Sequence, residues 1–229
     1  MNRRSATVSP TSSLMNPYIP FSRNHLLQVL FVSFLVFWAV MAIRPTDRMQ
    51  WLLENVLVVV SGLLLILTYP KYRFSNLSYL CIFVFLCLHT YAAHHTYQNT
   101  PMDMWLKASF HTQRSYFDRV VHFAFGLLLT YPMREMLMRK AGLRGFWSLA
   151  VSAAAIFACS SLFEILEMIV ALVGAQAGQD YMGMQGDPFD THKDMALGLA
   201  GAIVSMGIVA WVRYRNRHLG DKQRNKATA

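Results

Sequence analysis

Residues 52–69 of the sequence read LLENVLVVVSGLLLILTY and contain a single charged residue, Glu54. A helix needs about 20 mostly apolar residues to cross the roughly 30 Å hydrocarbon core of a bilayer. Lipid offers the backbone no hydrogen-bonding partner, so an uninterrupted apolar stretch of this length is expected to be helical. The stretch therefore predicts a transmembrane helix.

Five further stretches have the same character, and together they predict an all-α polytopic membrane protein with six transmembrane helices. The expected spans are residues 26–43, 52–69, 77–97, 118–138, 146–174 and 194–214. The first is expected to remain as a span, because no small-residue cleavage pattern follows it. Residues 1–24 are rich in Ser, Thr and Pro and are expected to be disordered, residues 25–214 to form the membrane domain, and residues 215–229 to form a basic tail.

The composition agrees with this fold class and argues against a soluble domain. Hydrophobic residues make up 55% of the 229 residues and charged residues only 14%, with a formal net charge of +9. A globular chain is about 25% charged. The cysteines, Cys81, Cys87 and Cys159, all lie in apolar stretches, so we expect no disulfide framework. No basic surface of the kind that binds nucleic acid is recognisable, and the partner expected is the lipid bilayer.

The positive charges predict the orientation of the chain. Fifteen of the 21 Lys and Arg residues fall in the two termini and the two loops on one side of the expected spans, and six fall on the other. Because positive residues are retained in the cytoplasm, both termini are expected to be cytoplasmic.

Histidines and carboxylates gather on the opposite, outward side. They come from the end of the third span, the starts of the fourth and sixth, the outer part of the fifth, and the last outward loop. Ionisable groups at membrane depth are costly and therefore indicate function. The candidate metal ligands are His94, His95, Asp118, His122, Asp190 and Asp194, and the candidate catalytic carboxylates are Glu164, Glu167 and Asp187.

The residue types suit acid/base chemistry with or without a metal. Imidazole nitrogen and carboxylate oxygen together are ligands for zinc, manganese or iron, and further carboxylates could act on a metal-bound water. His122 follows Asp118 at i+4, and Glu167 follows Glu164 at i+3, so each pair shares a helix face. Arg119 and Lys193 are candidates to hold an anionic head group. His89, deeper in its span, is a secondary candidate.

Structural explanations compete with this hypothesis. Ser115 with Asp118, and Thr191 with Asp194, have the spacing of a capping box. Small residues such as Ser160, Gly198 and Gly201 are interpreted as helix packing, and aromatic residues at span ends, Tyr97 among them, as interfacial anchors.

A family resemblance is carried by four segments: YAAHHTY at 91–97, FDRVVHF at 117–123, FEILEM at 163–168 and GDPFDTHKDM at 186–195. In these segments the sequence resembles the YjdF family of bacterial inner-membrane proteins, over roughly residues 21–213. The resemblance implies a multi-pass inner-membrane protein and no particular reaction. The stretch from Asp190 to Asp194 also resembles VanZ-like membrane proteins, which suggests a link to the cell envelope by analogy.

The leading hypothesis is a site at the periplasmic face that acts on a lipid or another envelope molecule. One alternative is a cation- or proton-coupled transporter, although transporters place their sites near the midplane. Another is a non-catalytic structural membrane protein whose outer acidic residues cap helices.

Overall fold

The structure is a computed structural model that describes Leu14 and residues 19–111, 115–181 and 189–227. The regular structure of these residues is helical throughout. A 3₁₀ helix, η1 (Phe21–Arg23), precedes seven α-helices: α2 (His25–Met41), α3 (Arg48–Thr68), α4 (Asn76–His94), α5 (Pro101–Phe110), α6 (Phe117–Lys140), α7 (Trp147–Tyr181) and α8 (Asp190–Ala227). The all-α expectation is confirmed.

Each of the six expected spans coincides with an α-helix. Four of these, α3, α4, residues 147–170 of α7 and residues 190–219 of α8, are long and apolar enough to cross a membrane by length and composition. Helix α2 is apolar but shorter, and α6 carries charged residues in its first and last turns. The described chain therefore has the character of a membrane protein built from helices.

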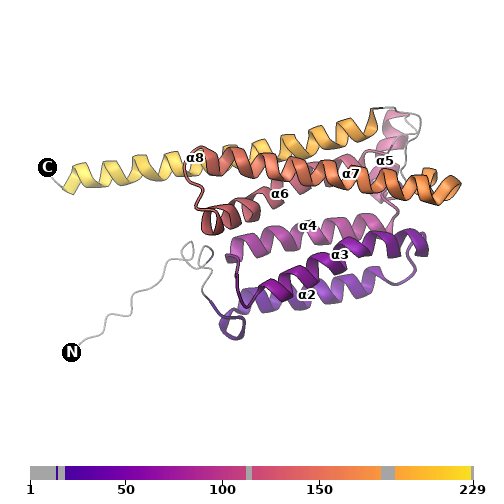
Figure 1. Ribbon diagram of the computed structural model, residues 1–229, viewed down its shortest axis with the longest axis horizontal. Helices are drawn as coiled ribbons and strands as arrows, with labels where there is room; N and C mark the ends of the chain where they lie inside the picture. The colour runs from indigo at the N-terminus through magenta and orange to yellow at the C-terminus, as the bar shows by residue number, and fades with distance from the viewer. Residues whose placement is uncertain (1–13, 15–18, 112–114, 182–188, 228–229) are drawn as a thin grey trace.

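Helix α6 lies at the centre of the bundle. It packs against α4, α7 and α8, while α2 and α3 pack against α4 (Figure 1). The long helices run between the same two ends, and α2 begins at the end where α8 finishes (Figure 1).

Helices α6 and α8 approach so closely that their glycines are in backbone contact. A Cβ added at Gly126 would lie 1.9 Å from the carbonyl oxygen of Gly198, and one at Gly201 would lie 2.2 Å from that of Phe123. Gly198 and Gly201 thus pack as expected from the sequence. Because α6 and α8 begin at the same end, this contact brings together the polar residues of their first turns.

Helix α5 holds the beginning of α6. Asp103 is fully buried, and its Oδ1 accepts hydrogen bonds from the backbone N–H groups of Tyr116 (2.6 Å) and Phe117 (3.3 Å). Its other oxygen forms an ion pair with Lys107 at 2.9 Å. These residues lie between the third and fourth expected spans, so α5 is a helix that the sequence pattern does not predict.

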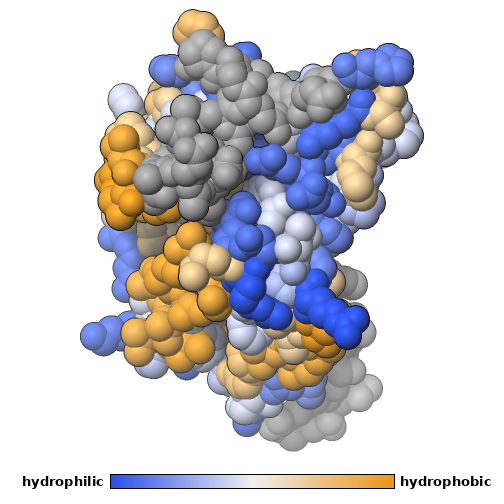
Figure 2. Space-filling model, turned by 90° about the vertical axis from the view of Figure 1, so that its right-hand side faces the viewer, coloured by the Kyte–Doolittle hydropathy of each residue, from blue (hydrophilic) through white to orange (hydrophobic). Residues whose placement is uncertain are grey.

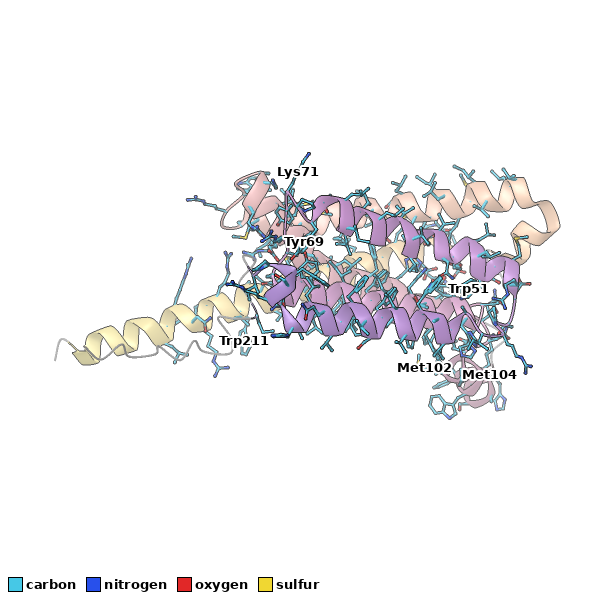
Figure 3. The ribbon with its side chains drawn as sticks, turned by 90° about the horizontal axis from the view of Figure 1, so that it is seen from below. Trp51, Tyr69, Lys71, Met102, Met104 and Trp211 are labelled. Atoms are coloured by element: carbon cyan, nitrogen blue, oxygen red, sulfur yellow. The ribbon has the colours of Figure 1, made fainter. Side chains whose placement is uncertain are left out.

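Different residues mark the two ends of the bundle. Tyr69 and Lys71 lie at one end, and Trp51, Met102 and Met104 at the other (Figure 3). Near Lys71, Glu135 of α6 accepts hydrogen bonds from Ser75 and Ser78 at the start of α4. We call the end that contains α5 the α5 end.

Two terminal expectations concern residues that are only partly described. Most of the segment 1–24 lies outside the described residues, and in its last part Asn24 donates a hydrogen bond to Asn76 at 2.6 Å. The segment expected as a basic tail continues α8 as far as Ala227.

Candidate functional site

His122 lies between two carboxylates at the α5 end. Its Nε2 is 3.1 Å from Oε1 of Glu164 on α7 and 3.7 Å from Oδ1 of Asp118, one turn earlier on α6. Only 6% of His122 and 5% of Glu164 are exposed. Oε1 of Glu164 accepts no aligned hydrogen bond from the described residues, so it retains capacity for a further partner. We refer to Asp118, His122 and Glu164 as the His122 triad.

Further charged groups surround the His122 triad. Asp194 of α8 is 3% exposed and lies within electrostatic range of His122 and Asp118. Glu167 lies within range of Asp118 and Glu164. Nη2 of Arg119 forms an ion pair with Oδ1 of Asp190 at 3.2 Å. Helices α6, α7 and α8 therefore bring most of the predicted site residues together. Figure 2, which views this end, shows a hydrophilic band between hydrophobic regions of the surface.

The capping box expected from Ser115 and Asp118 does not form at the start of α6. Helix α6 has Tyr116, not Ser115, at its N-cap position, and the N-cap side chain makes no capping hydrogen bond. Helix α8 begins at Asp190, so Thr191 already lies within its first turn. Asp118 nevertheless lies in the first turn of α6, and a capping role for Asp194 stays a prediction.

A pocket of about 230 Å³ adjoins the His122 triad. Asp118 and His122 line it, and the greater part of its wall is apolar, formed by Leu57, Phe85, Val121, Phe125, Phe163 and Leu166. Helices α3, α4, α6 and α7 all contribute to the wall. A mainly apolar pocket with a few convergent polar groups is the usual form of a small-molecule site.

The same pocket contains a second polar group, formed by residues whose contact the sequence does not predict. Tyr97 donates a hydrogen bond from its hydroxyl to Nδ1 of His89 at 2.6 Å, and Nε2 of His89 donates to the carbonyl oxygen of Glu54 at 3.1 Å. Thr96 and Tyr97 have φ values of 53° and 57°, which turn Tyr97 back toward the helix. Non-glycine residues seldom adopt this conformation, and functional sites are where it concentrates. Tyr97 is thus more than an interfacial anchor.

Ser160 is also part of the pocket wall. It is 1% exposed, and its Oγ has no hydrogen-bonding partner among the described residues. It packs against α8, since a Cβ added at Gly198 would lie 2.9 Å from its Oγ. Ser160 precedes Glu164 by four residues, a spacing that could have suggested a shared face.

The remaining predicted residues are less closely associated with the His122 triad. Nδ1 of His94 donates to the carbonyl oxygen of Met41 at 2.8 Å, and the ring of His95 packs against that of Tyr91. Asp187 lies outside the described residues.

A metal centre stays a prediction. Within the described ranges, no group of three or more His, Cys, Asp or Glu side chains is disposed to hold one metal ion.

Comparison with known proteins decides the family. Residues 26–215 match the family described as "Predicted membrane protein (DUF2238)". The chain belongs to this family. It is also 30% identical, over 178 residues, to the inner membrane protein YjdF of Escherichia coli (strain K12). The matched region covers 77% of this chain and 84% of that protein. The resemblance to the YjdF family is thereby confirmed, and no solved structure matches the chain.

Proposed function

We propose that this DUF2238-family protein is a multi-pass inner-membrane protein that carries out acid/base chemistry on a lipid, or on another envelope molecule, at its periplasmic end. The observation that carries the proposal is the 3.1 Å contact between His122 and Glu164 beside a largely apolar pocket. Apolar walls accommodate the hydrophobic part of a substrate, while the imidazole and carboxylate exchange protons at its polar part.

In this proposal, α2, α3, α4, α6, α7 and α8 cross the membrane and both termini are cytoplasmic. The excess of Lys and Arg at the end opposite α5 supports this orientation. Helix α6 crosses despite its charged ends because it is enclosed by α4, α7 and α8. A membrane-impermeant thiol reagent in intact cells should therefore label Trp105→Cys and not Lys71→Cys.

The candidate site residues have distinct roles in this proposal. His122 and Glu164 are the proton-transferring pair, since their 3.1 Å separation is within the range for direct transfer. Asp118, 3.7 Å from the imidazole, orients it. Arg119 carries positive charge to the rim, where it and Lys193 can attract a phosphate head group. Glu167 and Asp187 remain proposed as supporting carboxylates.

The metal-assisted form of the proposal uses His122 with Asp118, Asp190 and Asp194, joined by His94 or His95. Zinc, manganese and iron are the ions suited to such ligands. Elemental analysis of the purified protein tests it: a stoichiometric metal lost in both His122→Ala and Asp194→Asn would support a metal centre. If no metal is found above background after reconstitution, the metal-assisted form is refuted and acid/base chemistry without a metal remains the proposal.

The proposed function is tested with the full chain in nanodiscs supplied with a bacterial envelope lipid extract. Mass spectrometry should show a lipid species that changes with time in the wild type and not in Glu164→Gln. His192→Gln is the matched control, because His192 is exposed on the first turn of α8. Unchanged lipids together with proton flux across wild-type vesicles would instead favour the transporter.

A further inference from the structure

Residues of α3 and α7 line one side of the pocket. Leu57 of α3, and Leu162 and Leu166 of α7, all line it. Leu162 is 57% exposed and Leu166 is 51% exposed, so this part of the wall also faces the outside of the bundle. Within the described part of the chain, α3 and α7 are not among the helix pairs that pack extensively.

The surroundings of this side of the pocket are apolar. Helices α3 and α7 are two of the four helices that are long and apolar enough to cross a membrane. The residues beside it that point outward are exposed and aliphatic, namely Val56 and Val60 on α3 and Ile165 and Ile169 on α7. At membrane depth, such a surface meets lipid acyl chains and no water.

The interior changes from apolar to polar along the pocket. Phe85 and Val121, 5% and 6% exposed, form its inner wall. Ser160, with its unpartnered buried hydroxyl, lies on the same wall as the His122 triad. An unsatisfied buried hydroxyl is costly, so it indicates a partner supplied from outside the described chain. A carbonyl or hydroxyl oxygen of a ligand would meet this need.

We infer that the pocket binds one acyl chain of a membrane lipid, which enters sideways from the bilayer between α3 and α7 with its ester group directed to Ser160 and His122. The inference names the substrate class of the proposed function and rests on it for the chemistry. The binding itself needs no reaction. We call the opening bounded by Leu57, Cys159, Leu162 and Leu166 the lateral opening.

A photoactivatable lipid tests this inference directly. The full chain in nanodiscs containing phosphatidylglycerol with a diazirine on one acyl chain is irradiated, and the labelled residues are located by mass spectrometry. The expected result is labelling of the inner-wall residues Phe85 and Val121, in addition to the exposed residues Ile203 and Ile208 of α8, which contact lipid in any case. Labelling of the α8 residues without the inner wall would overturn the inference.

Two variants test the route of entry. Cys159→Trp and Leu57→Trp place a bulky ring on opposite walls of the lateral opening, and each should remove the labels at Phe85 and Val121 while leaving those at Ile203 and Ile208. Inner-wall labels that persist in both folded variants would contradict entry between α3 and α7.

A third variant separates binding from chemistry. Glu164→Gln should keep the inner-wall labels, because apolar contacts hold the acyl chain of the lipid. Inner-wall labels in the wild type without any lipid turnover would refute the proposed chemistry and still support binding of the acyl chain. Lipid turnover without inner-wall labels would refute binding of the acyl chain and still support the proposed chemistry.

Discussion

Nε2 of His122 lies 3.1 Å from Oε1 of Glu164, and both side chains are at least nine-tenths buried. The residues are 42 positions apart in the sequence and belong to α6 and α7. Taking two ionisable groups out of water is expensive, and stability alone seldom explains such a pair. A buried pair of this kind beside a pocket is instead typical of a functional site.

The triad residues should differ in their importance for lipid turnover. Glu164→Gln keeps the volume of the side chain but removes its capacity to take up a proton, so we expect turnover to fall at least about 100-fold. Asp118→Asn should cost less, because Asp118 lies farther from Nε2 at 3.7 Å and its side chain is 35% exposed. Initial rates in nanodiscs provide the comparison. A larger loss in Asp118→Asn would reverse the assigned roles.

The contact between α6 and α8 should tolerate no added methyl group. In Gly126→Ala the new Cβ would meet the Gly198 carbonyl at 1.9 Å, so the helices must separate, at a cost of about 3 kcal/mol. Gly207→Ala is the control, since nothing lies within 4 Å of its Cβ. Thermal unfolding in one detergent should show a lower Tm for Gly126→Ala only. Equal Tm values would mean that the two helices do not approach as described.

Asp103 should contribute more to the free energy of unfolding than an exposed capping residue does. Asp103→Ala removes a fully buried acceptor of two backbone N–H groups at the start of α6, for which we expect a loss of about 2 kcal/mol. Asp47→Ala removes the exposed cap of α3, which accepts from Gln50, and should cost about 1 kcal/mol. Parallel unfolding curves give the ranking. Asp103→Ala should also lower turnover, because the first turn of α6 carries Asp118.

Tyr72, in the loop between α3 and α4, should titrate late. Burial, followed by the nearby Glu135 carboxylate, raises the pKa of Tyr72 from 10.0 to about 12. The folded protein thus holds this proton more tightly than the unfolded chain does. Its contribution to stability is complete below pH 10 and is lost as the pH rises toward 12. The difference in phenolate absorbance between wild type and Tyr72→Phe measures the midpoint, and a midpoint near 10 would show that the phenol is freely solvated.

The long helices could be predicted because their signal is local. An apolar stretch such as 52–69 is recognisable without knowing what surrounds it. Helix α5 could not be predicted in this way. Its sequence, PMDMWLKASF, is short and mixed in character, and what holds it is the tertiary contact of Asp103 with the beginning of α6.

The same distinction applies to the site. The proximity of Asp118 to His122 follows from their i, i+4 spacing on one helix. The contact of His122 with Glu164 depends on how α6 packs against α7, and the sequence could indicate only that both lie toward the same end. From the sequence Tyr97 is predicted only as an anchor, because nothing local predicts the positive φ value that turns it onto His89.

The central claim is that His122 and Glu164 act as one proton-transferring unit, and a double-mutant cycle tests it most directly. Lipid turnover is measured in nanodiscs for the wild type, His122→Gln, Glu164→Gln and the double variant. We expect the double variant to be no slower than the slower single variant, because residues that act as a unit lose their contribution when either is removed. Losses that multiply in the double variant, or the absence of any turnover in the wild type, would contradict the claim.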